Sequence, residues 1–309
     1  MAKKTETGGF KTSIGGQALM EGILMRGPEK QSIVCRLPDG TLKTKIEDVK
    51  PAPKTPFVRG IHIFVSSLYN GMNALSYSAG LQPEESQEGP SKFDLWLEKK
   101  LGSEAAEKAV IALAVILGVA LAVGLFVLLP AFLFELLPDR LNLVLRCILE
   151  GLIRIVIFLV YLWLASRMKE IKRVFSYHGA EHKTIFCYEK GLELTVENVR
   201  KQSRFHPRCG TSFLLVVIVV SILVNSLVRL SNSFARMGCH LLLLPVVVGV
   251  SYEINRWCGR HDNALSAALS APGKWLQHMT TNEPDDGMIE CAIRALELVI
   301  PEEKGSDAW

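Results

Sequence analysis

Four long apolar runs separated by polar segments dominate the pattern of the 309-residue chain. The first, residues 109–134, contains no charged residue and exceeds the roughly 20 apolar residues that a helix needs to cross a hydrocarbon core. The others follow at residues 141–166, 211–228 and 237–252. The pattern predicts a mainly α-helical, polytopic membrane protein with about four transmembrane helices.

The polar first part of the chain, residues 1–56, carries a β-hairpin pattern. Residues 31–37 and 41–49 have strand character and flank the turn sequence Pro38-Asp39-Gly40. We therefore expect a small N-terminal cytoplasmic region that contains a β-hairpin.

Two further segments favour helices that do not cross the membrane. Residues 60–81 are uncharged but contain Ser, Asn and Gly throughout, which favours a helix at the membrane interface or packed on the bundle, with a span as the alternative. Residues 285–300 place apolar side chains at helical spacing and predict an amphipathic helix. After the N-terminal region, the expected organisation is an interfacial helix and polar loop at 57–107, a transmembrane hairpin at 108–166, a cytoplasmic loop at 167–210, a second transmembrane hairpin at 211–252 and cytoplasmic C-terminal helices at 253–309.

The distribution of Lys and Arg orients these spans. Residues 167–208 contain ten Lys or Arg, whereas the short connectors between spans contain few. Because positively charged loops remain in the cytoplasm, we expect this segment and both termini there, in a multi-pass protein of the cytoplasmic (inner) membrane. The polar start of the chain predicts insertion without a cleavable signal peptide.

Charge and cysteine content narrow the partners. The net charge of +4 and the absence of a basic stripe interleaved with aromatics argue against nucleic acid. The seven scattered cysteines form no C-x-x-C pair and indicate reduced thiols. The expected partners are the lipid bilayer and other membrane proteins.

Histidine and cysteine gather in the segment 167–210. If residues 176–186 are helical, His178 and His182 lie one turn apart and can present imidazole nitrogen to one metal ion. With Glu181 they match the H-x-x-E-H pattern of inverted zinc peptidases, a short pattern of low specificity. His206 and Cys209 offer third and fourth ligands, and such a nitrogen and sulfur set suits zinc.

Several interpretations of these residues stay open. A structural site would use all four groups, whereas a catalytic site would use three and leave one position open. Without a metal, the histidines would cap helices or bind lipid phosphate beside nearby Lys and Arg. Cys209 could instead be a nucleophile at a helix N-terminus with His206 as its base.

Two distant carboxylates are candidates to complete the site. Glu21 lies in a glycine-rich stretch, residues 15–28, whose alternative is a helix or strand edge with solvated charges. Glu253 follows the fourth span and is a ligand, a base or an interface residue. Residues 280–284 predict the start of the last helix, with Pro284 in its first turn.

At these residues the chain resembles the YqhQ-like family of uncharacterised bacterial polytopic membrane proteins, whose members are labelled predicted metal-dependent enzymes. The resemblance rests on five motifs in order: Gly-Gly-Gln-Ala-Leu-Met-Glu-Gly at 15–22, Tyr-His-Gly-Ala-Glu-His-Lys at 177–183, Arg-Phe-His-Pro-Arg-Cys-Gly-Thr-Ser-Phe at 204–213, Ser-Tyr-Glu at 251–253 and Thr-Thr-Asn-Glu-Pro at 280–284. It implies family motif positions at Glu21, His178, Glu181, His182, His206, Cys209, Glu253 and Glu283.

The leading hypothesis is a metal-dependent hydrolase, with zinc as the metal, acting at the cytoplasmic face. Its ligands would come from His178, His182, His206 and Cys209. Glu181 or Glu253 would be the general base, with Glu21 as a further catalytic carboxylate. The alternative is a non-catalytic membrane scaffold or assembly factor, in which a structural metal stiffens the loop and amphipathic segments bind other membrane proteins.

Overall fold

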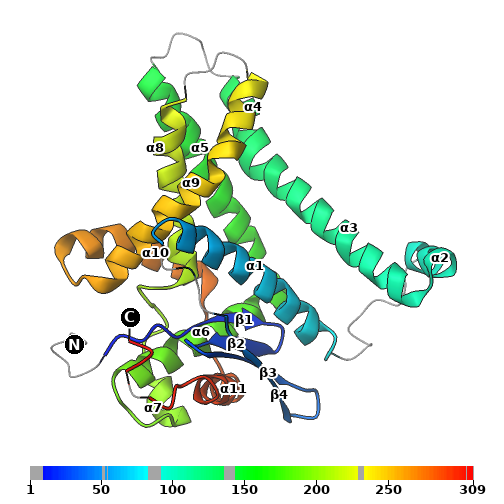
Figure 1. Cartoon of the computed structure of the whole chain (residues 1–309), viewed down its shortest axis with the longest axis vertical. Coiled ribbons are helices and arrows are strands. Elements are labelled where there is room, and N and C mark those ends of the chain that lie inside the picture. Colours follow the sequence, from blue (N-terminus) through cyan, green and yellow to red (C-terminus); the bar gives the residue numbers. More distant parts are fainter. Residues whose placement is uncertain are drawn as a thin grey trace.

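The computed structural model describes residues 10–50, 53, 55–82, 92–135, 143–228, 233–303 and 305–308. The protein is mainly helical, with one four-stranded antiparallel sheet near the N-terminus. A column of apolar helices stands on a second part that contains the sheet and both termini (Figure 1). The mainly helical fold class is confirmed.

The sheet consists of two consecutive hairpins in the order β1-β2-β3-β4. The predicted hairpin is confirmed, and Gly40 in its turn has a φ of +84°. The first hairpin was not predicted and falls on the glycine-rich stretch, where Glu21 takes a positive φ of 48° in the turn. The strands are β1 (Gly15–Leu19), β2 (Gly22–Arg26), β3 (Lys30–Arg36) and β4 (Leu42–Asp48).

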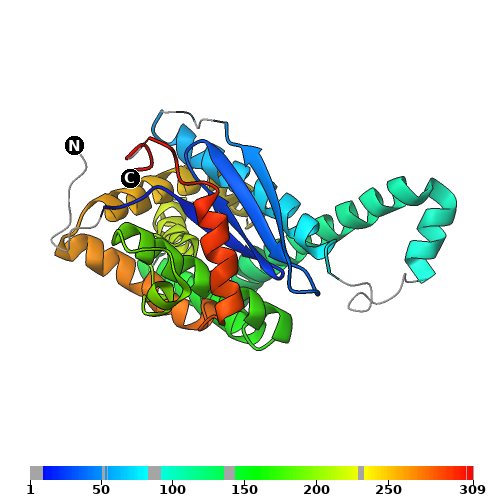
Figure 2. The same cartoon turned by 90° about the horizontal axis from the view of Figure 1, so that it is seen from below.

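Helices cover both faces of the sheet. Alternation along β2 sends Ile23 and Met25 into the core shared with α6 (Lys169–Glu189) and α11 (Asp286–Glu297). The opposite face packs on α1 (Val58–Ala79) through a smaller cluster around Leu24 and Ala74. Figure 2 shows α11 lying across the sheet from below.

The column is built from α5 (Leu143–Ala165), α8 (Gly210–Ser226) and α9 (Ser233–Arg260). Two stretches among the described residues, Ile148–Ala165 and Leu241–Arg260, are long and apolar enough to cross a membrane, yet only 11% and 22% of them are buried. Exposed apolar helices of this kind indicate association with a membrane.

The helix expected over residues 109–134 has three consecutive parts. They are α3 (Ser103–Val123), a π-helical turn η2 (Gly124–Leu128) and α4 (Leu129–Glu135). Of these three parts, α4 packs on α5, whereas α3 runs away from the column toward α2 (Lys92–Leu101) (Figure 1). The apolar stretches Ala112–Phe126 and Gly210–Val224 are shorter, so two of the four expected spans are long and apolar enough to cross a membrane among the described residues.

Four details differ from the sequence-based expectations. The segment 167–210 is largely helical, as α6 and α7 (Val196–Arg200). The expected C-terminal helices include α10 (Ala264–Thr280), whose bounds were not predicted and which begins with a capping box of Asn263 and Ser266. Residues 280–284 were wrongly interpreted as a helix start, because α10 ends at Thr280 and α11 begins at Asp286. Glu253 lies within α9, not beyond it.

The helix expected over residues 60–81 is α1, which packs on α9 and on β1. Its small residues Gly60, Gly71 and Ala74 are buried. Its opposite side exposes apolar side chains at helical spacing: Val65, Leu68, Tyr69, Met72 and Leu75. The polar loop predicted after it falls largely on residues 83–91, outside the described part of the chain.

Candidate metal centre

Three side chains from two segments meet between α6 and the start of α8. His178 and His182 lie one turn apart on α6, and Cys209 immediately precedes α8. The Nε2 atom of His178 is 3.2 Å from the Cys209 Sγ atom. Ligand atoms of all three residues lie within 4.8 Å of one another. One metal ion can therefore contact all three.

Backbone carbonyls fix the orientation of both imidazoles. The Nδ1 atom of His178 is 2.8 Å from the Thr280 carbonyl oxygen, and that of His182 is 2.5 Å from the Arg204 carbonyl oxygen. A carbonyl oxygen only accepts, so each Nδ1 carries a hydrogen, and Nε2 is the nitrogen left to face the thiol or a metal. A histidine that binds a metal through one ring nitrogen usually donates the N–H of the other to such an acceptor.

Cys209 has the surroundings of a thiolate. Burial raises the pKa of its thiol, but His178 and His182 outweigh burial and bring the pKa well below its usual value. The backbone N–H of Thr211 donates to Sγ at 3.4 Å, and the Thr211 hydroxyl lies 3.2 Å away. Burial lowers the pKa of His178, but the Cys209 charge outweighs it and raises that pKa to about 9. Because metals bind the thiolate, the cysteine is prepared for ligation.

Glu181 is the carboxylate that lies beside this group. Its side chain is buried and accepts the backbone N–H of Gly16 at 2.9 Å. Burial raises its pKa, while the charges of His178 and His182 oppose that rise. A Cβ at Gly16 would lie 2.6 Å from the Leu24 carbonyl oxygen and 3.1 Å from the Glu181 carboxyl carbon. The close approach of β1 to α6 therefore requires glycine at position 16.

His206 lies next to the three-residue group but is not a member of it. The Gln277 amide clamps its backbone through two hydrogen bonds of 2.7 Å. Its Nδ1 accepts the Arg208 N–H at 3.3 Å, and its Nε2 is 3.6 Å from a Glu189 oxygen. Burial lowers the pKa of His206 to about 4, so the imidazole is neutral. Its ring centroid lies 5.5 Å from that of His182.

The other motif carboxylates form ion pairs away from the group. Glu21 pairs with Arg173, whose hydrogen bonds lower the pKa of the carboxyl, and it also accepts the Tyr177 hydroxyl at 3.2 Å. Glu253 pairs with Arg59. Among the described residues, neither joins the three-residue group.

Glu283 makes a third such contact, because its carboxylate lies 2.7 Å from the Lys183 Nζ atom and 3.4 Å from Arg204. It joins the extended segment after α10 to α6 and to the segment that carries Cys209. Its ion pairs thus connect two walls of the site.

Sequence reasoning missed the residues that hold this site together. Thr280 contributes a main-chain carbonyl, which leaves no side-chain signal. Gln277 is fully buried and could be found only by recognising α10 from its capping box. Gly179 allows the segment after α10 to approach α6, since a Cβ there would lie 2.0 Å from the Asn282 carbonyl oxygen.

Comparison with known proteins assigns the family. A family model described as "Protein of unknown function (DUF1385)" matches residues 55–302. The chain belongs to the DUF1385 family. A relative described as "Uncharacterized protein YqhQ", from Bacillus subtilis (strain 168), is 35% identical over 298 residues, which cover 91% of this chain and 90% of the relative. The YqhQ-like resemblance is thus confirmed.

No solved structure matches this DUF1385 chain. The family model includes His178, His182 and Cys209, and it leaves the first hairpin with Glu21 outside its bounds.

Proposed function

We propose that this DUF1385 protein is a zinc-dependent hydrolase of the cytoplasmic membrane, with His178, His182 and Cys209 as its metal ligands. The observation that carries the proposal is the set of two imidazoles, each oriented through its Nδ1 atom, and one thiol of lowered pKa, whose ligand atoms lie within 4.8 Å of one another. Nitrogen and sulfur donors in this number suit zinc. Three protein ligands are the number found in catalytic zinc sites.

Glu181 is the residue that would move the proton. Such an ion supplies Lewis acidity toward a carbonyl or phosphoryl oxygen. The buried Glu181 carboxylate, whose pKa burial raises, would take a proton from the attacking water and pass it to the leaving group. The Gly16 N–H holds one oxygen of Glu181 and leaves the other for that task.

A four-span topology with the site on the cytoplasmic side accompanies this proposal. Exposed apolar side chains along α3, α5, α8 and α9 support burial of these helices in lipid. The Lys- and Arg-rich segment 167–208 and both termini share the end of the molecule that holds the sheet (Figure 1). That arrangement agrees with positive residues remaining in the cytoplasm.

The non-catalytic scaffold is the competing proposal, and the exposed apolar side of α1 favours it. In a scaffold the zinc site would be closed by a fourth ligand, and His206 is the neighbour that could turn to supply one. The two proposals therefore differ in whether His206 is a zinc ligand. If the protein is the proposed enzyme, His206→Ala retains zinc, and if it is the scaffold, His206→Ala loses zinc.

Metal content of the full-length protein, purified without a metal-binding tag, tests the proposal. We expect near-stoichiometric zinc in the wild type, loss of zinc in His178→Ala and in Cys209→Ala, and retention in the control His261→Ala, whose side chain is exposed at the end of α9. A wild-type protein that carries no metal, and that cannot be loaded with zinc, manganese or iron, would refute it.

A further inference from the structure

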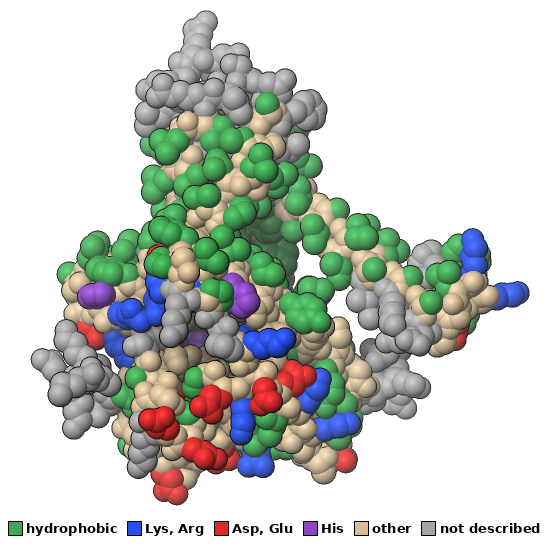
Figure 3. All heavy atoms as spheres, in the orientation of Figure 1, with side chains coloured by type: hydrophobic (Ala, Val, Ile, Leu, Met, Phe, Trp, Pro, Cys, Tyr) green, Lys and Arg blue, Asp and Glu red, His purple; other side chains and the backbone are tan. Residues whose placement is uncertain are grey.

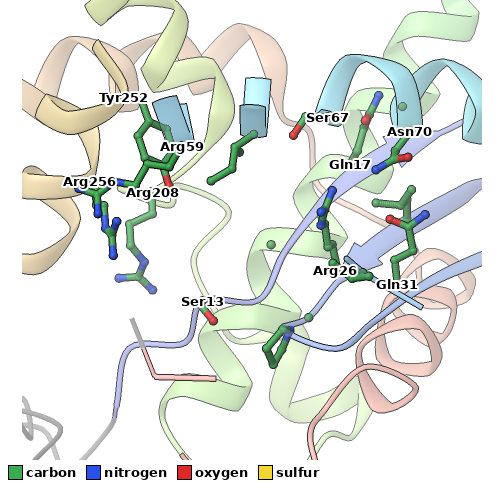
Figure 4. Close-up of a pocket in the computed structure, with 18 of the residues that line it drawn as sticks. Ser13, Gln17, Arg26, Gln31, Arg59, Ser67, Asn70, Arg208, Tyr252 and Arg256 are labelled. Atoms are coloured by element: carbon green, nitrogen blue, oxygen red, sulfur yellow. The ribbon is translucent and has the colours of Figure 1, made fainter. Parts of the chain in front are cut away.

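A cavity of about 860 Å³ lies beside the candidate metal centre, between the sheet, α1 and the C-terminal end of α9 (Figure 4). Its volume is in the range of pockets that hold small molecules. Gly16, whose N–H holds Glu181, is part of its wall, and so is Arg208, the neighbour of Cys209. The cavity and the candidate metal centre therefore share a wall.

Among the described residues, the charged side chains that line this cavity are all basic, with no Asp or Glu. They are Arg26, Lys50, Arg59, Arg208, Arg256 and Arg260. Two are compensated from outside the cavity, since Arg59 pairs with Glu253 and Arg208 with Glu189. Arg26 and Arg256 are half-buried and form no salt bridge in the described part of the chain, and the charge of Glu253, which pairs with Arg59, also acts on Arg256. An excess of positive charge thus faces the cavity.

Helix electrostatics explains only part of this charge. Arg260 lies in the last turn of α9, where the helix dipole favours a cation. Arg26 comes from β2, and Arg59 and Arg256 come from two different helices. Gathering like charges from three elements costs free energy unless an anion offsets it.

The two ends of the cavity differ in chemistry. Arg59, Arg208 and Arg256 lie at one end, whereas Gln17, Gln31 and Asn70 lie near Arg26 at the other (Figure 4). The Oε1 atom of Gln31 is buried and accepts no hydrogen bond from the residues that the structure describes. An arginine-rich end suits phosphate oxygens, and an amide-rich end suits hydroxyl groups.

The cavity also lies close to the expected membrane surface. The α1 residues that line it, among them Ile63 and Ser67, belong to a helix whose other side exposes apolar side chains, and its α9 residues follow the apolar part of that helix. On the face in Figure 3, basic side chains lie directly below the apolar region, and most acidic ones lie further down. A ligand there could reach the cavity from the lipid surface or from the cytoplasm.

We infer that this cavity binds the phosphate ester of a small polyol, with the phosphate among the arginines of α1 and α9 and the hydroxyls at the amide end. A phospholipid head group and a soluble polyol phosphate share this chemistry. Ligand binding in this cavity needs no zinc, so we expect it to persist in His178→Ala. If the protein proves to bind no metal, the inference about the cavity is unaffected.

Native mass spectrometry of the detergent-solubilised full-length protein tests this binding with two probes, glycerol 3-phosphate and dioleoylphosphatidylglycerol. We expect Arg256→Gln, which faces the phosphate, and Arg26→Gln, which faces the hydroxyls, each to raise Kd by about tenfold, the scale of one lost hydrogen bond to a charged group. The matched control is Arg294→Gln, which removes an exposed arginine of α11 outside the cavity lining and leaves Kd unchanged.

The two probes separate the sources of the ligand. Arginine-dependent binding of glycerol 3-phosphate supports a soluble polyol phosphate, and arginine-dependent binding of the lipid alone supports a head group. The inference is overturned if the wild type binds neither probe, or if all variants bind equally. Unchanged thermal unfolding of the variants shows that lost binding does not come from misfolding.

Discussion

Gly179→Ala tests how strictly the segment after α10 must lie against α6. The new Cβ would lie 2.0 Å from the Asn282 carbonyl oxygen, well inside the 3.4 Å at which ordinary contact begins. The clash is with backbone, so no side-chain rotation relieves it. The segment that carries the Thr280 carbonyl must therefore move away from α6.

The structure sets the size of the effect. Moving the segment strains the hydrogen bond from the Asn282 N–H to the Phe175 carbonyl and the contact of His178 Nδ1 with Thr280, both 2.8 Å. Overpacking costs about 1–3 kcal/mol, whereas alanine in place of glycine in a helix returns about 1 kcal/mol. Loss of the contact that orients a metal-binding histidine lowers metal affinity by about 10- to 100-fold.

The assay is the zinc Kd from chelator competition, together with the Tm of the metal-free protein. The control is Gly118→Ala in α3, where no atom of a described residue lies within 4 Å of the new Cβ. The control is expected to keep the wild-type Kd and to match or exceed its Tm. A Gly179→Ala protein with the wild-type Kd and Tm would show that the close approach does not orient His178.

Three further predictions concern charge and exposure. Arg173 lowers the pKa of Glu21, so this ion pair stabilises the fold above the unfolded pKa of the carboxyl, and the stabilisation is lost as pH falls through the folded pKa. The Tm of the wild type should therefore fall more steeply below about pH 4 than the Tm of Arg173→Gln. Parallel profiles of Tm against pH would contradict this. In metal-free protein, the rate at which iodoacetamide alkylates Cys209 should fall less between about pH 8 and about pH 6 than the rate for an ordinary thiol, because the pKa of Cys209 is lowered. Peptide mass spectrometry measures both rates, and a decline as steep as that of an ordinary thiol would contradict this. Val156→Arg on the exposed side of α5 should reduce the fraction of the protein that inserts into membranes, because arginine at the centre of a span costs about 2.5–3.5 kcal/mol. The control Leu192→Arg lies outside the apolar helices and should leave this fraction unchanged. Equal inserted fractions for the two variants would count against burial of α5 in lipid.

Local patterns in the sequence predicted the elements whose signal is contained in one segment. The spacing of His178 and His182 depends only on α6 being helical. The hairpin of β3 and β4 follows from alternation around Gly40, and α11 follows from its apolar periodicity. In each case neighbouring residues alone carry the information.

The partners within the site could not be predicted in the same way. His206 is three residues from Cys209, yet the Gln277 clamp holds its backbone while its ring faces Glu189, and His178 from α6 takes the place beside the thiol. Glu21 and Glu253 looked equally available in the sequence. Arginines 152 and 194 residues away decide that both are paired.

The first hairpin was missed for a related reason. Glycines in β1 and β2 weaken a strand pattern, but here they give the sheet its close contacts. Gly16 leaves room for the Glu181 carboxylate. A Cβ at position 22 would lie only 2.6 Å from the Val34 carbonyl oxygen, so glycine is needed there as well. Such contacts between distant segments leave no periodicity in the sequence.

Both imidazoles of the candidate centre are oriented by main-chain carbonyls, those of Thr280 and Arg204. Replacing either side chain leaves the carbonyl in place, so an alanine scan would not register these two supports. Variation at positions 204 and 280 among relatives would likewise say little about whether the supports are kept. Amide-to-ester replacement, which weakens the carbonyl as an acceptor without changing its position, would reveal them.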